Sequence, residues 1–420
     1  MKRLLLLSFF IPILLLDVKS QNWGWQIFEV ANMPMPISNN AVVEGYANDT
    51  GYVYSFGGID STKIWSGINK KSFRYNTTSD IWDTIPDLPN PNAVIAAGAS
   101  YVDSIIYIMG GYQVLSNGNE ISSNIVNRFD PRTNTYLSDG TSIPVATDDH
   151  VQTVYKDSLI YLITGWNNVG NIPNVQIYDP INDNWLTGTP VPNNNTYKAF
   201  GASGIIINNT IYYHGGASMG TNFPGQANLR IGQIDPNNPT QITWTLQSTQ
   251  FVTYRAACTF GPTGNPYWLG GSEITYNYNG IAYNGSGGVP TKSTNLRYSN
   301  SMALVNTTGG AIPMDLRGIA SFDGIQNDTE TKYITGGMLT GQQVSNKTYR
   351  IDITALVGID ENSFQSSFQL YPNPTSEKIN LVFDKKEERA ITLINVVGKE
   401  VLKKNTNTTN FQLDISPYPK

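Results

Sequence analysis

The chain is poor in cysteine, in histidine and in charge. Among its 420 residues there is one cysteine, Cys258, there are two histidines, His150 and His214, and only 14% of the residues are charged. A single cysteine cannot form an internal disulfide, so packing has to hold the fold together. The sequence shows no spacing typical of a metal-ligand cluster, a phosphate-binding loop or a nucleophile elbow. We therefore expect no metal and no cofactor, and we assign no catalytic residue.

The chain also lacks a large excess of charge and a long apolar run. The formal net charge of −5 argues against nucleic acid or an anionic membrane as a partner. The apolar run over residues 4–16 follows Lys2 and Arg3 and is too short to span a bilayer as a helix. Small or modest residues end this segment at Ser20, which is typical of a secretory signal peptide over residues 1–20. We expect an exported mature chain without a transmembrane segment.

Glycine and tyrosine, in contrast, are abundant, and they occur in a repeat. With 38 glycines, 24 tyrosines and few charges, the composition favours strands and turns over helices. A short apolar run that ends in a glycine turn recurs as YVYSFGG (52–58), IIYIMGG (105–111), LIYLITG (159–165), TIYYHGG (210–216), NPYWLGG (265–271) and TKYITGG (331–337). The copies follow one another at 51 to 66 residues, which indicates a repeated structural unit.

Each copy is one part of a longer unit. A second strand, a Pro/Asn/Asp turn and an aromatic residue follow it, as in KSFRYNTTSDIW (71–82) and VQIYDPINDNW (175–185). A further strand precedes each glycine turn, so every unit supplies four strands. The inner strands are nearly continuous apolar runs, which is expected if neighbouring units cover both of their faces. Six units of this kind predict an all-β protein built as a six-bladed propeller.

The glycine turn, the aromatic residue after it and the Trp or Tyr that opens the fourth strand resemble the kelch repeat. The likeness covers residues 22–353, is strongest in the first three units, and departs from the pattern at Thr164, which replaces the first glycine. The resemblance implies a kelch-like β-propeller whose turn glycines have a structural role. These are Gly57, Gly58, Gly110, Gly111, Gly165, Gly215, Gly216, Gly270, Gly271, Gly336 and Gly337.

We expect the ring of blades to close through the N-terminus. After residues 348–353 the sixth unit lacks a fourth strand and its tryptophan, whereas residues 22–36 resemble the fourth-strand segments of other units. Residues 22–33 would therefore complete the last blade, through Trp25, and leave no open edge on the ring. The propeller domain then spans residues 21–353.

A polar linker, residues 354–367, separates the propeller from a C-terminal domain over residues 368–420. In this domain YPNP (371–374) and NVVGKEV (395–401) resemble the type A C-terminal sorting domain that Bacteroidetes use for type IX secretion. The resemblance implies a small β-sandwich-like domain, the secretion machinery as a partner, and a location outside the cell or on its surface. An unrelated small β-domain is the alternative. The chain stops where this family usually continues, so we expect the domain to be truncated.

Kelch-like rings usually bind ligands at one end of the central channel, near the start of each innermost strand, and many kelch proteins place arginine there. Counting back 14 to 19 residues from each glycine turn gives six candidate ligand-binding residues: Asn40, Asn92, His150, Lys198, Arg255 and Arg317. Together they would form a cationic pocket for a carboxylate, an acidic sugar or an acidic peptide. The alternative is that they only cap strands and bind water. Aromatic surface could come from residues just after the turns, although most propeller aromatics pack between blades, namely Tyr112, Trp166 and Tyr276.

Two enzyme classes share this architecture. Copper radical oxidases of the galactose oxidase type need two histidines beside two tyrosines on copper, and His214 falls inside a strand here, which argues against them. Sialic acid epimerases are six-bladed kelch propellers, and Asp148 and Asp149 beside His150 could imitate their acid–base chemistry. An Asp-Asp pair before a strand is also an ordinary turn. The sequence favours a secreted or cell-surface binding module that recognises a protein or a carbohydrate at one channel mouth, with a sugar epimerase as the alternative.

Overall fold

The computed structural model of the chain describes residues 22–261, 264–278, 294–297, 304–306, 312–322, 329–356, 368–371, 377–394 and 400–417. The expected signal peptide, most of the expected linker and much of the YPNP and NVVGKEV segments lie outside these residues. The chain divides into two compact units, of which one is Trp23–Ala355 and the other contains Leu356–Lys420.

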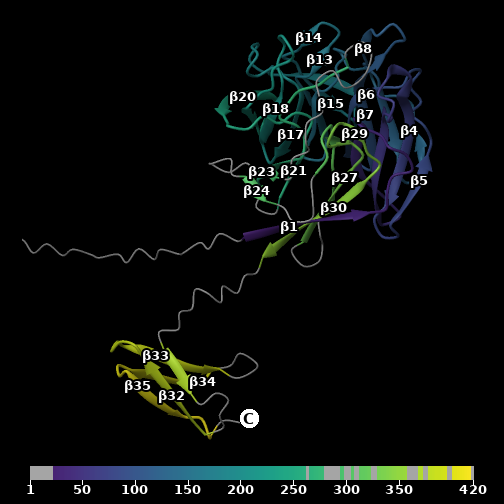
Figure 1. Cartoon of the computed structure of the whole chain (residues 1–420). Helices are drawn as coiled ribbons and strands as arrows, with labels where there is room; N and C mark the ends of the chain where they lie inside the picture. Colours follow the sequence, from purple (N-terminus) through teal and green to yellow (C-terminus); the bar gives the residue numbers. More distant parts are fainter. Residues whose placement is uncertain are drawn as a thin grey trace, which may run out of the picture. The chain divides into compact units, whose positions relative to one another are not determined.

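Within Trp23–Ala355, antiparallel four-stranded sheets follow one another along the chain (Figure 1). The first is formed by β2 (Ala41–Ala47), β3 (Thr50–Ile59), β4 (Ile68–Asn76) and β5 (Ile81–Ile85), and the second by β6 (Ile95–Val102), β7 (Ile105–Val114), β9 (Val126–Asp130) and β10 (Thr135–Tyr136). The third is formed by β11 (Val151–Tyr155), β12 (Leu159–Ile163), β15 (Val175–Asp179) and β16 (Asn184–Gly188).

The fourth sheet is formed by β17 (Phe200–Ile207), β18 (Thr210–Ala217), β19 (Asn228–Asp235) and β20 (Asn238–Ser248), and the fifth by β21 (Ala257–Phe260), β22 (Pro266–Leu269), β23 (Thr294–Arg297) and β24 (Leu304–Asn306). The sixth is formed by β26 (Ala320–Phe322), β27 (Thr329–Thr335), β30 (Thr348–Leu356) and β1 (Asn22–Val30). These sheets are the blades of a β-propeller, which is the fold class that the sequence predicts.

Short elements lie beside the blades. β8 (Glu120–Ser122) extends β7 as a hairpin, and the pairs β13 (Trp166–Asn167) with β14 (Gly170–Asn171) and β28 (Met338–Leu339) with β29 (Gln343–Val344) follow the glycine turns of blades three and six. β25 (Arg317–Gly318) runs parallel to β2 of blade one. The 3-10 helix η1 (Trp65–Gly67) follows β3.

The second strand of each blade is apolar because it is covered on all sides. β7 pairs with β6 on one edge and with β9 on the other, and its residues from Ile106 to Tyr112 are all buried. A strand with both edges paired and both faces packed exposes no face to water, so polar residues are not needed in alternation. This explains the continuous apolar run that marks every copy of the repeat.

The second residue of each glycine pair joins one blade to the next. In every blade its backbone N–H donates to the carbonyl oxygen just before the next blade: Gly58 to Val94 (3.3 Å), Gly111 to Thr147 (3.1 Å), Gly165 to Ala199 (3.0 Å), Gly216 to Thr253 (2.7 Å), Gly271 to Pro313 (3.1 Å) and Gly337 to Ile37 (3.0 Å). The last of these bonds returns from blade six to blade one. The ring is therefore closed by main-chain hydrogen bonds.

Blade three shows how a threonine replaces the first glycine. Thr164 has a φ of 51°, in the left-handed region that normally favours glycine. Its hydroxyl donates to the carbonyl oxygens of Ile172 (2.9 Å) and Ala199 (3.2 Å) and accepts from the N–H of Ala199 (3.0 Å). These bonds to the neighbouring blade offset the conformational cost of a side chain in this region.

β1 forms the outer strand of blade six by pairing with β30. Trp25 on this strand is 3% exposed, and its ring lies 4.6 Å from that of Tyr267 in blade five. Outer-strand aromatics have the same kind of role in other blades, where Trp185 packs 5.0 Å from Tyr178 and Tyr136 packs 5.0 Å from Phe129. The N-terminal strand thus fills the outer position of the last blade.

The C-terminal unit contains two sheets. β31 (Phe368–Tyr371), β32 (Lys378–Phe383) and β35 (Asn410–Asp414) form one, and β33 (Arg389–Ile394) and β34 (Glu400–Thr406) form the other. Leu381, Phe383 and Leu413 are its buried core, with Ile391 and Leu402 packed against them. In the described part of the whole chain, no helix is long and apolar enough to cross a membrane.

Candidate functional site

The entrance to each innermost strand carries one residue in the left-handed conformation. These residues form a ring around the channel, one from each blade: Asn39, Ala96, Asp149, Gly201, Arg255 and Asp315, with φ between 49° and 65°. Backbone bonds connect neighbours in this ring, such as Gly201 N–H to the Asp149 carbonyl (2.9 Å) and Arg255 N–H to the Gly201 carbonyl (2.8 Å). The ring sets the true structural register of the blades.

Three charged members of this ring neutralise one another. Arg255 is fully buried, and its guanidinium contacts both carboxylate oxygens of Asp149, with Nε 3.1 Å from Oδ1. Its Nη1 lies 3.4 Å from Oδ1 of Asp315, which is also buried. Asp315 accepts a further bond of 2.5 Å from the hydroxyl of Ser38. Buried charges require such partners because their transfer from water is costly.

Aromatic residues cover this side of the channel. Tyr276 and Tyr112 are each 2% exposed, and the ring of Tyr254 lies 4.7 Å from the centre of the Arg255 guanidinium. The side chain of Asn277 accepts from Arg255 Nη2 and from the Tyr112 hydroxyl, both at 3.3 Å. The segment after the blade-five glycine turn therefore lies over Arg255 and separates it from solvent.

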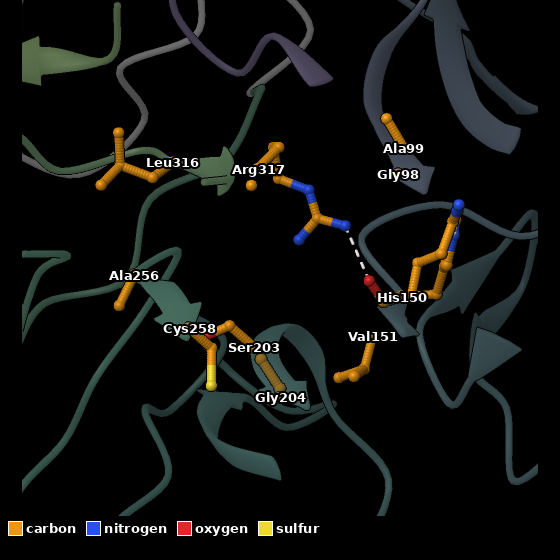
Figure 2. Close-up of a pocket in the computed structure, with 13 residues that line it drawn as sticks. Gly98, Ala99, His150, Val151, Ser203, Gly204, Ala256, Cys258, Leu316 and Arg317 are labelled. Carbon is orange, nitrogen blue, oxygen red and sulfur yellow. Dashed lines mark hydrogen bonds between the residues drawn. The ribbon is translucent and has the colours of Figure 1, made fainter. Parts of the chain in front are cut away.

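Arg317 reaches across the channel to blade three (Figure 2). Its Nη2 donates to the His150 carbonyl oxygen at 2.7 Å, and its Nη1 lies 3.6 Å from Asp149. His150 Nε2 is bonded to Gln152 Oε1 at 3.1 Å. Burial, with a contribution from the Arg317 charge, lowers the pKa of His150 to about 4, so this histidine is neutral at neutral pH.

A cavity of about 70 Å³ lies inside the channel beside these two residues. Its lining comes from the innermost strands and includes Gly98, Ser203, Cys258 and Arg317. A cavity of this size holds a few water molecules or a small ion, whereas an apolar cavity of roughly 150 Å³ is needed for a single benzene ring. The channel cavity is too small for a sugar.

A larger groove lies on the rim between blades one and two. It measures about 580 Å³ and is lined by residues from η1, from the segment before β6 and from the β7–β8 hairpin: Trp65, Ser66, Ile68, Asn92, Ala93, Gln113, Val114, Leu115, Ser116 and Asn117. Trp65 is 44% exposed, and its backbone N–H donates to the Tyr278 hydroxyl at 3.1 Å. The groove thus adjoins the aromatic cover of the channel.

Glu120, at the end of the same hairpin, has an unusual environment. Burial raises the pKa of its carboxyl to about 7, against an opposing effect of Arg255, and Asp149 raises it further. Asp148 nearby is buried and accepts a bond of 2.5 Å from the Ser122 hydroxyl. Burial and the neighbouring Asp149 raise its pKa well above the usual range of a carboxyl group.

The structure brings some of the six predicted ligand residues together and separates others. His150, Arg255 and Arg317 meet at the channel, and Asn40 is buried next to the ring with its amide donating to Ser55 at 2.8 Å. Asn92 lies four positions before the ring residue of its blade, is exposed, and lines the rim groove instead. Lys198 lies three positions before Gly201 and outside the ring.

The predicted open cationic pocket is therefore absent from the described residues. Arg255 is buried and paired with two carboxylates, and Lys198 does not join it. Tyr112 and Tyr276 pack as core rather than as sugar-binding surface. Trp65, which the sequence analysis missed, is the aromatic residue on the rim, and its only signal was a tryptophan in the loop after a glycine turn.

The comparisons with known proteins agree with the two-part architecture. Residues 369–420 match the family described as the secretion system C-terminal sorting domain. The chain is 25% identical over 152 residues to Kelch-like protein 15 of Homo sapiens, which covers 36% of this chain and 23% of that protein. It is 26% identical over 198 residues to Kelch-like protein terF of Aspergillus terreus, covering 45% of this chain and 40% of the relative. The chain thus spans less than half of the length of these relatives.

Among solved structures, the one titled "Structure of YjhT" is similar with a TM-score of 0.57 and 16% identity, covering 76% of this chain and 95% of the other. At this identity the likeness shows the fold alone. Together, these findings show a kelch-type β-propeller followed by a C-terminal sorting domain, and the sorting domain implies export to the cell surface or beyond.

Proposed function

We propose that this exported propeller is a binding module and that its ligand lies in the rim groove between blades one and two. The observation that carries the proposal is the groove of about 580 Å³ with the half-exposed indole of Trp65 on its wall. This volume falls within the range of small-molecule sites, about 300–1,000 Å³. The groove also adjoins the channel mouth, where kelch-like rings are expected to bind.

The chemistry of the groove favours a carbohydrate over an acidic ligand or a protein. Its lining holds an indole face, the amides of Asn92, Gln113 and Asn117, and the hydroxyl of Ser116, and it holds no charged side chain among the described residues. An aromatic face stacks on the apolar face of a sugar ring, and amides exchange hydrogen bonds with its hydroxyl groups. We therefore assign a neutral sugar unit of a glycan as the ligand.

The epimerase alternative has less support. Its expected acid and base lie at the channel, where Asp149 is held by Arg255 and Asp148 by Ser122, and the channel cavity does not admit a sugar. One observation favours it: Glu120, with a pKa of about 7, follows the hairpin that lines the groove. A carboxyl with such a pKa is suited to proton transfer near neutral pH.

A glycan array tests the binding proposal. The mature wild-type chain is compared with Trp65→Ala and Asn92→Ala, and with Ile181→Ala, which truncates an apolar residue that is 79% exposed on another blade. We expect a subset of neutral glycans to bind wild type and Ile181→Ala equally, and Trp65→Ala to bind at least about tenfold more weakly, a loss of roughly 1.4 kcal/mol. No glycan binding by wild type, or binding that survives both groove substitutions, would contradict the proposal.

The same array supplies the test of the alternative. Each glycan that binds is incubated with the protein and analysed by NMR for a changed configuration at any carbon of the sugar. Turnover that disappears in Glu120→Gln while binding persists would favour the enzyme. Binding without turnover would leave the binding module as the function.

A further inference from the structure

The small cavity inside the channel holds a single charged side chain. Of its thirteen lining residues, shown in Figure 2, only Arg317 carries a charge and none is acidic. Room for the cavity comes from inner-strand residues with little or no side chain, such as Gly98, Ala202 and Gly204. His150 is neutral, as described above, and adds no second charge. The local electrostatics therefore favour an anion over a cation.

Arg317 brings an incompletely satisfied guanidinium to this cavity. Its side chain is 5% exposed, and its Nη1 lies 3.6 Å from Asp149, beyond the length of a good hydrogen bond. Arg255 already contacts both oxygens of that carboxylate. The Nε–H of Arg317 has no acceptor among the described residues. A buried charged donor without an acceptor is costly, so the cavity is expected to take up an acceptor from solvent.

A second donor lines the same cavity. The hydroxyl of Ser203, on β17, makes no hydrogen bond with another described residue. A hydroxyl rotates to suit its partner, so it can donate to a group bound beside Arg317. The volume of about 70 Å³ limits that group to a few atoms, because one water molecule takes about 30 Å³ in the liquid.

We infer that the channel cavity is a binding site for a small monovalent anion, of the class of halide, nitrate or formate, held by the Nε–H of Arg317 with the Ser203 hydroxyl as a second donor. The anion completes the polar contacts of Arg317, which also bonds to blade three through the His150 carbonyl. It thereby stabilises the contact between the last blade and the third. This site is separate from the rim groove and does not depend on the proposed function.

Bromide is the probe for this site. Crystals of the mature chain are soaked in sodium bromide and its positions are located by anomalous diffraction. In solution, thermal unfolding is followed as sodium bromide replaces sodium gluconate, an anion too large for the cavity, at constant ionic strength. We expect a bromide peak at hydrogen-bond distance from Arg317 Nε and a saturable rise in the unfolding midpoint of about 2 °C or more.

Two variants make the test specific. Arg317→Gln removes the charge, and Ala99→Val fills part of the cavity while Arg317 remains, so both should lose the peak and the saturable rise; Ile181→Ala should keep them. If Arg317→Gln fails to fold, Ala99→Val decides. Bromide found only at exposed residues, as an adventitious ion only, or a cavity that contains water alone, would overturn the proposal. The same midpoint rise in Ala99→Val as in wild type would overturn it too.

Discussion

The guanidinium of Arg255 holds the carboxylate of Asp149 across the central channel, although 106 residues separate the two in sequence. Both side chains are buried, and Arg255 also contacts Asp315 of the sixth blade. One side chain therefore connects blades three, five and six. A buried ion pair adds little net stability over an apolar replacement, but it strongly penalises the loss of either partner alone. We interpret this contact as one that fixes the relative positions of the blades.

Replacing Arg255 should destabilise the propeller strongly. Arg255→Met leaves Asp149 and Asp315 buried without their main cation, which is expected to lower the free energy of unfolding by about 3–5 kcal/mol. Lys71→Ala, which removes a half-exposed partner of Asp87, is the control and should cost less than about 1 kcal/mol. Chemical denaturation measures both. Equal losses in the two variants would show that Arg255 has no special role.

The N-terminal strand should contribute to the stability of the whole ring. Trp25→Ala removes a buried indole from the contact between blades six and five, with an expected loss of about 3–5 kcal/mol. Trp65→Ala, on the exposed rim, should change stability by no more than about 0.5 kcal/mol. The two unfolding midpoints are compared by calorimetry. An unchanged midpoint in Trp25→Ala would mean that β1 is dispensable for closure.

The turn glycines should be required for close approach and not only for conformation. A Cβ on Gly111 would lie 2.6 Å from the Ile95 carbonyl oxygen, whereas one on Gly341, with a similar positive φ, would have no atom within 4 Å. Gly341→Ala should therefore cost only the backbone strain, about 1 kcal/mol, and Gly111→Ala distinctly more. Denaturant titration of both variants gives the difference. If both lose the same stability, backbone conformation alone explains the glycine.

Stability should fall in mild acid because His150 is buried in its neutral form. Its pKa is lowered from 6.5 to about 4 in the folded protein, so between these values the unfolded chain binds a proton that the folded chain does not. This contribution is complete above pH 6.5 and is lost as the pH falls toward 4. His150→Gln removes it, so the stability difference between wild type and variant should shrink by about 2 kcal/mol from pH 7.5 to pH 5. A constant difference would contradict the assignment.

Local patterns in the sequence predicted the blades well but not the identity of the channel residues. Counting back from the glycine turns located Arg255 correctly, yet it placed Asn92 and Lys198 in the ring, where Ala96 and Gly201 stand. The count assumes equal hairpins, but ring and turn are 18 residues apart in blade one (Asn39 to Gly57) and 14 in blade two (Ala96 to Gly110). Hairpin length depends on local turn geometry, which varies from blade to blade.

The sequence by itself determined the repeat, because a doubly covered strand and a turn at positive φ each restrict which residues can occupy them. It also determined the separate C-terminal domain through its own motifs. Only the tertiary structure decided what the charged residues do. Whether an arginine is an exposed ligand or a buried tie depends on which distant segment lies beside it, here Asp149, Asp315 and the aromatic cover at Tyr276. Such contacts join residues whose spacing in the chain carries no local signal, so they appear only when the ring is closed.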